Sequence, residues 1–244
     1  MEIKGRVVLI TGGAVRVGGV ISRTLAERGA KVVVHYFNSQ EAAKKLVTAI
    51  RNFGGEAIAV RADVSKSGDV KRMVDESQKV FGRIDVLINN AAVFYRTPFP
   101  DISDSDWRHF LDVNLSGAFY CAREVAKLML QQRSGKIINI ADVSGINPWP
   151  GYIPYSVAKG GLITLTKALA KALAPHIMVN CIVPGPVLLS DCSTEEEKQQ
   201  MVASTLLQRI GSPQDIANTV AFLIEGSDFI TGAIIPVDGG KLIR

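Results

Sequence analysis

The fold is decided by one stretch near the N-terminus, which reads Val7-Val8-Leu9-Ile10-Thr11-Gly12-Gly13-Ala14-Val15-Arg16-Val17-Gly18. Its first four residues are apolar and mostly β-branched, a pattern that predicts a buried strand. The glycines that follow let the backbone approach a pyrophosphate, and the N-terminus of a helix starting here favours the negative charge. The stretch therefore predicts a nucleotide-binding turn after the first strand of an α/β domain.

Short apolar runs alternate with longer amphipathic stretches from this turn to the C-terminus. Each run is apolar on both faces, as expected for a parallel strand that helices cover on both sides. The sequence predicts a single domain over residues 1–244, a Rossmann-like doubly wound sheet of seven mainly parallel strands with helices on both faces. The predicted strands are Val7 to Ile10, Lys31 to His35, Ala57 to Val60, Val86 to Ile88, Lys136 to Ile140, Met178 to Val183 and Ala233 to Val237.

The composition is that of an ordinary globular protein, with 47% hydrophobic and 21% charged residues. The formal net charge is +5, but Lys and Arg are scattered among acidic residues, so no nucleic-acid partner is expected. No apolar run reaches the roughly 20 residues that span a bilayer, and no signal sequence precedes the first strand. We expect a cytoplasmic protein without a membrane partner. The three histidines are dispersed, so no metal site is expected.

The end of the second predicted strand distinguishes NAD from NADP. An acidic residue there would bind the ribose 2′-hydroxyl of NAD and repel the 2′-phosphate of NADP. This chain instead reads His35-Tyr36-Phe37-Asn38-Ser39, without a carboxylate before Glu41. Arg16 in the glycine turn adds a cation that can reach the same phosphate. We therefore expect NADPH as the cofactor, with His35, Tyr36, Asn38 and Ser39 near its 2′-phosphate.

A tyrosine and a lysine lie one helical turn apart after the fifth predicted strand. Tyr155 and Lys159 are spaced i and i+4, which places them on one face of a helix. A nearby ammonium group favours the phenolate and lowers the pKa of a tyrosine, so the pair suits proton transfer near neutral pH. We expect Tyr155 and Lys159 to be catalytic.

With these elements in order, the sequence resembles the short-chain dehydrogenases/reductases over essentially its whole length. The matching elements are the Thr11 to Gly18 turn, Asp63-Val64, Asn89-Asn90-Ala91-Ala92, Asn114, the Tyr155/Lys159 pair and Pro184-Gly185. The resemblance implies that Asn114 supports a proton-relay water and that Lys159 also binds the nicotinamide ribose. It further implies cofactor contacts from Gly12, Val17, Gly18, Asp63, Val64, Asn90, Ala91, Ala92, Tyr155, Pro184, Gly185 and Val187.

At two positions the sequence departs from the general family, and at both it resembles the pteridine reductases. Arg16 replaces the usual second glycine of the turn, and Asp142 replaces the usual catalytic serine thirteen residues before Tyr155. The segment from Asn90 to Pro98 also resembles the loop of those enzymes whose phenylalanine stacks on the pterin, and Phe94 takes that place here. The resemblance implies an NADPH-dependent pteridine reductase, with Phe94, Asp142, Tyr155 and Leu188 at the substrate.

The chemistry of Asp142 agrees with this hypothesis. An ionised carboxylate repels the oxyanion that develops when a ketone is reduced, whereas a serine hydroxyl stabilises it. A carboxyl group instead recognises or protonates a ring nitrogen. Three alternatives stay open: a carbonyl reductase such as a 3-oxoacyl-(acyl-carrier-protein) reductase, an altered enzyme in which Asp142 is without a role, and a cofactor-binding protein without turnover.

The segment that follows Tyr155 predicts an oligomer. It carries small residues at Ala158, Gly160, Gly161, Ala168 and Ala172, which suit close packing against a symmetry-related copy. Family resemblance adds the C-terminal Val237-Asp238-Gly239-Gly240 segment as a second contact. We expect a homotetramer with two-fold interfaces.

Overall fold

The computed structural model describes residues 1–188 and 194–244. Its seven strands form one sheet in the order β3-β2-β1-β4-β5-β6-β7, and every neighbouring pair is parallel. The doubly wound Rossmann-like fold is thereby confirmed. The strands are β1 (Val7–Ile10), β2 (Lys31–Tyr36), β3 (Glu56–Arg61), β4 (Val86–Asn89), β5 (Gly135–Ile140), β6 (Ile177–Pro184) and β7 (Ile234–Val237).

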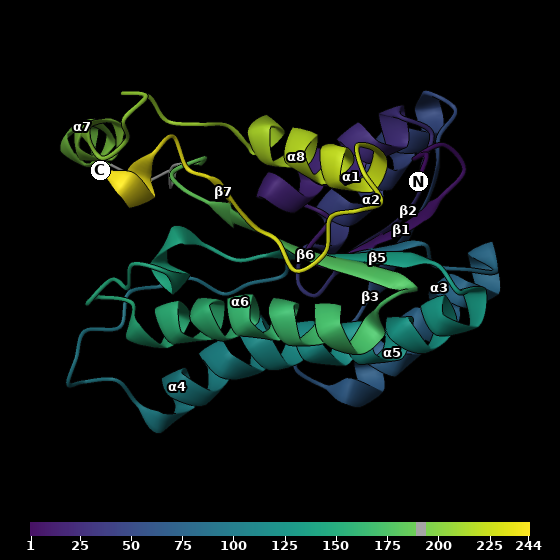
Figure 1. Ribbon diagram of the computed structural model, residues 1–244, viewed down its shortest axis with the longest axis horizontal. Coiled ribbons are helices and arrows are strands. Elements are labelled where there is room, and N and C mark those ends of the chain that lie inside the picture. The colour runs from purple at the N-terminus through teal and green to yellow at the C-terminus, as the bar shows by residue number, and fades with distance from the viewer. Residues whose placement is uncertain (189–193) are drawn as a thin grey trace.

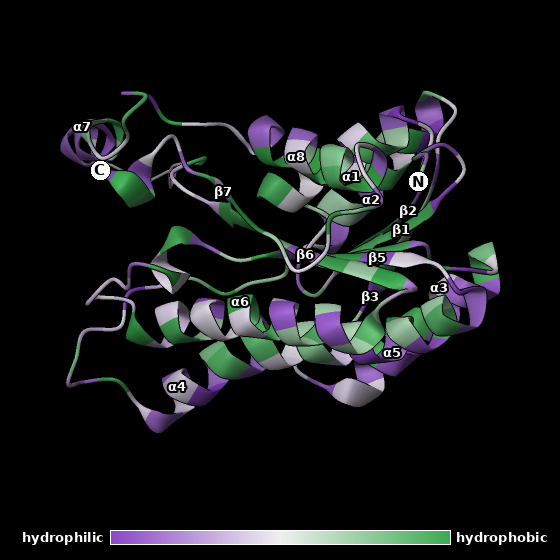
Figure 2. Ribbon diagram, in the orientation of Figure 1, coloured by the Kyte–Doolittle hydropathy of each residue, from purple (hydrophilic) through white to green (hydrophobic). Residues whose placement is uncertain are grey.

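Helices cover both faces of the sheet, because successive side chains of a strand point to opposite faces. In β1, Val8 and Ile10 pack under α1 (Arg16–Glu27), α2 (Gln40–Asn52) and α8 (Pro213–Glu225). Val7 and Leu9 pack on the other face, against α3 (Ser67–Phe81) and α5 (Gly117–Gln132). On that face α4 (Asp104–Leu111) and α6 (Ile153–Leu173) complete the layer (Figure 1). Figure 2 shows the central strands between the two layers as largely hydrophobic.

The edge strands depart from the predicted pattern. Both ends of β3, Glu56 and Arg61, are exposed, and Pro236 of β7 is exposed. The predicted run of β3, Ala57 to Val60, is apolar throughout, and the exposed residues are the two that extend it; in β7 the exposed Pro236 departs from the expectation of a strand covered on both faces. These strands lie at the two edges of the sheet, each with a strand neighbour on one side only.

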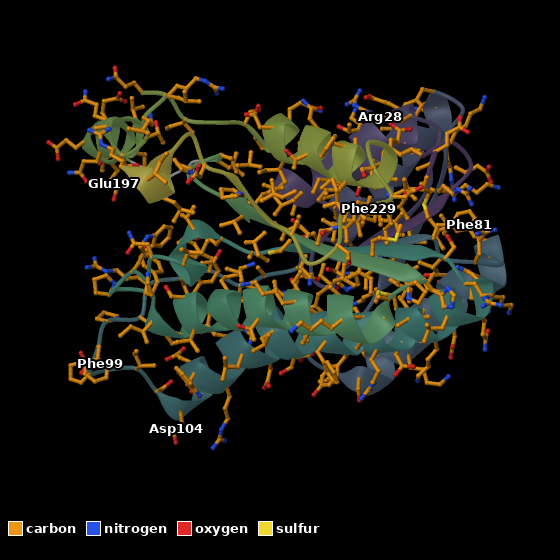
Figure 3. The ribbon with its side chains drawn as sticks, in the orientation of Figure 1. Arg28, Phe81, Phe99, Asp104, Glu197 and Phe229 are labelled. Carbon is orange, nitrogen blue, oxygen red and sulfur yellow. The ribbon has the colours of Figure 1, made fainter. Side chains whose placement is uncertain are left out.

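The carboxyl ends of the parallel strands meet at one edge of the sheet, and this edge carries the motifs. The order reverses between β1 and β4, at the kind of switch point where α/β folds bind their ligands. Figure 3 places Phe99, in the loop after β4, and Glu197, in α7 (Glu195–Ala203), at the same end of the molecule. In the described part of the chain, no helix has the length and apolar character needed to cross a membrane.

Candidate active site

The glycine turn is tied to the end of β4. Gly12 has φ +61°, a left-handed conformation that favours glycine. A Cβ at Gly18 would collide with the carbonyl oxygen of Gly12, so only glycine fits this close approach. The amide of Asn90 donates hydrogen bonds to the carbonyl oxygens of Thr11 at 3.0 Å and Gly12 at 3.1 Å. Asn90 therefore supports the turn from the next strand, with its amide nitrogen bonded to the backbone.

His35 supports the same turn from β2. Its Nδ1 accepts a hydrogen bond from the Gly12 backbone N–H at 2.9 Å, which leaves Nε2 to donate to the Ala62 carbonyl at 3.1 Å. The ring is 2% exposed, and its burial lowers the pKa of His35 from 6.5 to about 4. Both ring nitrogens thus bond to the protein, and the structure leaves neither for the predicted contact with a cofactor phosphate.

The end of β2 lies beside an exposed cation. Arg16 begins α1 with its side chain exposed and with φ +52°. A glycine adopts this left-handed conformation freely, whereas a residue with a Cβ is strained there by about 1 kcal/mol or more. Tyr36 is half-buried, and Asn38 and Ser39 form the loop into α2. The predicted 2′-phosphate region is thus built from a strained arginine and an acid-free loop.

Asp63 and Val64 follow β3, as predicted. The Oδ1 of Asp63 accepts hydrogen bonds from the backbone and hydroxyl of Ser65, and Oδ2 lies 3.6 Å from Lys66 Nζ. Val64 is buried and packs against Gly117 at the start of α5. The carboxylate of Asp63 therefore shapes its own turn.

The segment after β6 forms the remaining wall of the predicted cofactor groove. The Gly185 backbone N–H donates to the Val237 carbonyl at 3.0 Å, and a Cβ at Gly185 would lie 2.7 Å from Cα of Asp238. Val187 is buried, whereas Leu188 is 39% exposed. At Gly12 and Gly18 a side chain would fill the close approach of the backbone. Together with the segment after β6, these glycines fit a dinucleotide bound along the carboxyl edge of the sheet.

Three predicted catalytic residues meet where β5 ends and α6 begins. Lys159 is 3% exposed, its Nζ donates to the Ile140 carbonyl at 2.8 Å and lies 5.6 Å from the centroid of the Tyr155 ring. Asp142 follows β5, and its Oδ1 accepts a hydrogen bond from the Ser144 backbone N–H at 2.8 Å. The structure thus gathers a carboxyl, a phenol and an ammonium group in one buried cluster.

Burial controls the protonation of this cluster. It raises the pKa of Tyr155 well above 10, and the neighbouring Asp142 carboxylate raises it further. It also raises the pKa of Asp142, against the opposing effects of the Ser144 hydrogen bonds and the Lys159 charge. The pKa of Lys159 is lowered, again by burial. The expectation of a tyrosine with a lowered pKa is wrong here, because burial and a second acidic group outweigh the lysine. Tyr155 is held as a phenol, a proton donor.

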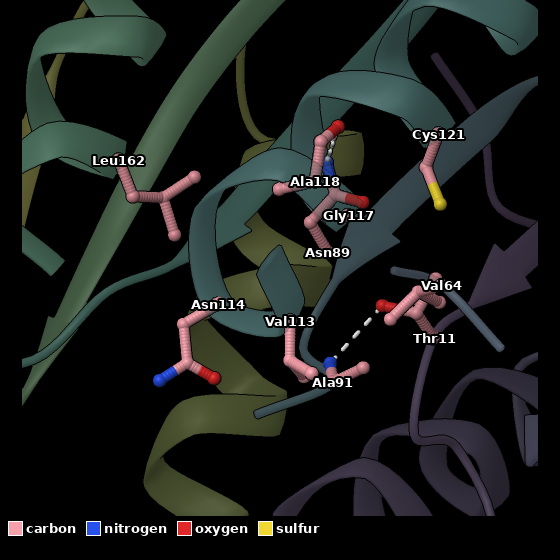
Figure 4. A pocket seen from close by; sticks show the side chains of 10 residues that line it. All are labelled: Thr11, Val64, Asn89, Ala91, Val113, Asn114, Gly117, Ala118, Cys121 and Leu162. Carbon is pink, nitrogen blue, oxygen red and sulfur yellow. Dashed lines mark hydrogen bonds between the residues drawn. The ribbon is translucent and has the colours of Figure 1, made fainter. Parts of the chain in front are cut away.

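Asn114 holds a loop of the site. It lies in a π-helical turn, η1 (Asp112–Ser116), between α4 and α5. Its Oδ1 accepts from the Val93 N–H at 2.8 Å, and its Nδ2 donates to the Val93 carbonyl at 3.0 Å. Asn114 and Asn89 line a cavity of about 10 Å³, which is far too small for an organic substrate (Figure 4). The side chain therefore positions the residue that precedes Phe94.

Phe94 forms an aromatic cluster with side chains from the loop after β5. Its ring stacks on Tyr152 at 4.7 Å between centroids, and it meets the Tyr155 ring edge-on at 4.9 Å. Trp149 is edge-on at 6.4 Å, and Phe94 is 54% exposed. Phe94 therefore stands partly exposed beside the Tyr155 ring, where the sequence predicts the substrate, with one face covered by Tyr152.

Two supporting residues have no role in the predictions from sequence. Ser144 is fully buried, and its backbone N–H fixes the Asp142 carboxylate. An aspartate two residues before such an N–H is a common N-cap, so the sequence Asp142-Val143-Ser144 could have indicated this contact. The Thr11 hydroxyl accepts from the backbone N–H groups of Asn90 and Ala91. In residues 1–188 and 194–244, no three His, Cys, Asp or Glu side chains are grouped to hold a metal ion.

Comparisons with known sequences identify related enzymes. Residues 13–241 match the family described as enoyl-(acyl carrier protein) reductase. A 3-oxoacyl-(acyl-carrier-protein) reductase from Synechocystis is 38% identical over 99% of this chain and 98% of its own. The enzyme of that name from Staphylococcus epidermidis is 39% identical over 95% of this chain and 97% of its own.

Solved structures show the same architecture. A short-chain dehydrogenase/reductase variant from Serratia marcescens superposes with a TM-score of 0.92 at 30% identity, covering 99% of this chain and all of that one. A dehydrogenase/reductase from Sinorhizobium meliloti superposes with a TM-score of 0.91 at 31% identity, covering 98% and 97%. The similarity extends over the sheet, both helical layers and the carboxyl edge.

Proposed function

Since this chain belongs to the short-chain dehydrogenase/reductase family, a family of oxidoreductases that bind a nicotinamide cofactor, we propose that it is an NADPH-dependent reductase. Gly12, Val17 and Gly18 would hold the pyrophosphate, and Lys159 the nicotinamide ribose. Ala91, Ala92, Pro184, Gly185 and Val187 would line the rest of the groove, with Asp63 and Val64 at the adenine. Arg16 and the acid-free end of β2 support NADPH over NADH. Bound NADPH supplies the hydride.

Tyr155 supplies the proton in this proposal. Its raised pKa keeps it protonated at neutral pH, so the hydroxyl is ready to donate as hydride reaches the substrate. The buried Lys159 lies one turn along α6 and stabilises the phenolate that is left. Asn114 acts on the site by holding Val93, and with it the loop that carries Phe94.

The proposed substrate is a pterin-like heterocycle, and the presence of Asp142 beside Tyr155 is the observation that supports it. The carboxyl group of Asp142 adjoins Tyr155 and is fixed by Ser144. In ionised form it accepts N–H donors of an aminopyrimidine ring, and in protonated form it donates to a ring nitrogen. Phe94 is partly exposed beside Tyr155, and a flat ring would stack on the face of Phe94 that Tyr152 does not cover. Leu188 would contact the same substrate.

A second candidate substrate is a 3-oxoacyl thioester. The relatives named above act on this class by their printed names, over nearly the full length of the chain. Neither of those names points to a pterin, so the comparisons support this candidate more directly than they support the first. The chemistry of Asp142 argues against it, because a carboxylate beside the developing oxyanion disfavours ketone reduction. Proteins that share a fold differ in function through their sites. The site of this chain has Asp142 at the position where the general family has a catalytic serine.

One assay separates the candidates. NADPH oxidation is followed with dihydrobiopterin and with acetoacetyl-coenzyme A under matched conditions. The proposal expects turnover of the pterin with a higher kcat/KM than that of the thioester. A fast reaction with the thioester and none with the pterin would establish the second candidate. NADPH binding without turnover of either would indicate a cofactor-binding protein.

We also propose that the chain forms a homotetramer, although the structure changes the reason. Ala158 is fully buried, and Gly160 and Gly161 approach Gly145 and Leu115 of the same chain. These three therefore serve packing within the chain. The predicted Ala168 and Ala172 are exposed on α6, as is Val157, and these small or apolar positions suit packing against a second copy. Light scattering at micromolar concentration should give four times the chain mass, and a monomer would refute the assembly.

A further inference from the structure

Arg61 is a cation at the cofactor edge that the predictions from sequence leave without a role. It is the last residue of β3, and its Cα pairs with that of Tyr36 at the end of β2. Its Nε donates to the Phe37 carbonyl at 3.2 Å, and its guanidinium lies over the Phe37 ring, 5.6 Å from the centroid. The first residue after β2 thus holds the arginine by both its backbone and its ring.

This arginine is not neutralised by a neighbouring acid. Among the described residues, no carboxylate lies within ion-pair distance of Arg61, and its two terminal nitrogens donate no hydrogen bond to the protein. Cations nearby differ in this respect, since Lys66 pairs with Asp63 and Arg72 pairs with Asp69. Holding a guanidinium on an aromatic ring fixes its direction while leaving its outer edge free to bind an anion.

The position of the outer edge of the Arg61 guanidinium indicates which anion it would bind. Backbone hydrogen bonds place the glycine turn against β2, since the Gly13 N–H donates to the His35 carbonyl at 2.9 Å. The segment from His35 to Gln40 contains no carboxylate. The exposed Arg16 lies in the turn on one side of this segment, and Arg61 lies at the end of the strand on its other side. An anion at the end of β2 would therefore have a guanidinium group on each side and no acidic side chain within the segment itself.

We propose that Arg61, held by Phe37, binds the 2′-phosphate of the cofactor's adenosine jointly with Arg16. The inference rests on the proposed preference for NADPH and adds a specificity-determining residue from the neighbouring strand. A guanidinium group forms paired hydrogen bonds with phosphate oxygens, so each arginine contributes a charge and a directed contact. The ring of Phe37 acts as the support on which Arg61 is oriented.

Equilibrium binding of adenosine fragments to the substrate-free protein tests this inference. Isothermal titration calorimetry compares adenosine 2′,5′-bisphosphate with adenosine 5′-monophosphate, which lacks the 2′-phosphate. Arg61→Gln should weaken binding of the bisphosphate by about tenfold or more, on the scale of a charge-assisted hydrogen bond. Binding of the monophosphate should stay within twofold. Phe37→Leu, which removes the ring and keeps the backbone contact, should produce a smaller loss of the same kind.

Arg72→Gln is the matched control, because it removes the same charge from a guanidinium already bonded to Asp69. Arg72→Gln should leave both affinities unchanged. If it weakens binding of the bisphosphate as much as Arg61→Gln does, the loss reflects the net charge of the protein, and the inference is overturned. Equal weakening of both ligands by Arg61→Gln would also overturn it, as would a full preference for the bisphosphate in that variant. If the parent protein itself fails to distinguish the two ligands, the proposed use of NADPH fails. Thermal unfolding of each variant confirms that it is folded.

Discussion

The two halves of the carboxyl edge use polar side chains in opposite ways. At the cofactor half, Asn90 and His35 bond to backbone groups of the glycine turn, and the cations Arg16 and Arg61 remain exposed. At the catalytic half, Lys159, Tyr155 and Asp142 are largely withdrawn from water and alter one another's pKa. Polar side chains thus build a rigid scaffold with exposed cations in the first half, and a buried group of residues coupled in their protonation in the second. Substitutions should therefore alter stability and affinity in the first and rate in the second.

The largest expected effect concerns the catalytic half. Tyr155→Phe removes the proton donor, so kcat/KM should fall by about 10²–10⁴ for whichever substrate the parent enzyme reduces. NADPH affinity, measured by fluorescence titration, should stay within a few-fold, because the ring and its packing remain. Activity within tenfold of the parent would show that another group delivers the proton. A comparable loss of NADPH affinity would erase the contrast between the two halves.

His35 should make stability depend on pH. The unfolded chain binds a proton on this ring below about pH 6.5, whereas the folded protein resists protonation until about pH 4. The unfolded state therefore binds more protons between these values, and stability falls as pH drops through this window. The integrated loss is about 3 kcal/mol. Urea unfolding at pH 7, 5.5 and 4 measures it.

The matched substitutions are His35→Gln and His109→Gln, since His109 is exposed on α4. The His35 variant should be less stable at pH 7 and show a flatter decline toward pH 4. The His109 variant should follow the parent. An unchanged pH dependence in His35→Gln would assign the acid sensitivity to other groups and remove His35 from the scaffold of the turn.

A smaller effect is expected at Arg16, where stability and specificity should move in opposite directions. The parent should prefer NADPH over NADH by at least about tenfold in kcat/KM, or roughly 1.4 kcal/mol. Arg16→Gly should reduce this preference, while relief of the φ +52° conformation raises the free energy of unfolding by up to about 1 kcal/mol. Steady-state kinetics with both cofactors and chemical unfolding provide the two readings. Equal use of both cofactors by the parent would sink the NADPH proposal.

The sequence predicted the fold well because periodicity and glycine placement are local signals. β1 has the predicted bounds, and the other six strands agree within one residue at each end. The edge strands were less regular, since exposure depends on strand order and not on local sequence. The motifs also located Tyr155, Lys159 and Asp142 together, because their spacing along α6 and after β5 constrains where they meet.

Roles that depend on neighbours distant in sequence were not predictable in the same way. The spacing of Tyr155 and Lys159 indicated a lowered tyrosine pKa, but burial, which no spacing encodes, raises it. The sequence predicted that His35 contacts a cofactor phosphate. Its ring instead bonds to Gly12, which follows β1, and to Ala62, which follows β3. Arg61 had no signal at all, because its contact with Phe37 arises from the register of β2 and β3.

In the proposed function Asp142 adapts this site to a ring nitrogen, and Asp142→Ser removes the carboxyl group on which this role depends. The measurement is the ratio of kcat/KM for dihydrobiopterin to that for acetoacetyl-coenzyme A, in the parent and in the variant, with folding checked by NADPH binding. Pterin kcat/KM should fall by roughly 10²-fold or more in the variant. Thioester kcat/KM should fall less or rise, because serine restores a neutral donor facing the oxyanion. Full retention of pterin activity in Asp142→Ser, with an unchanged ratio, would show that Asp142 does not act on the substrate.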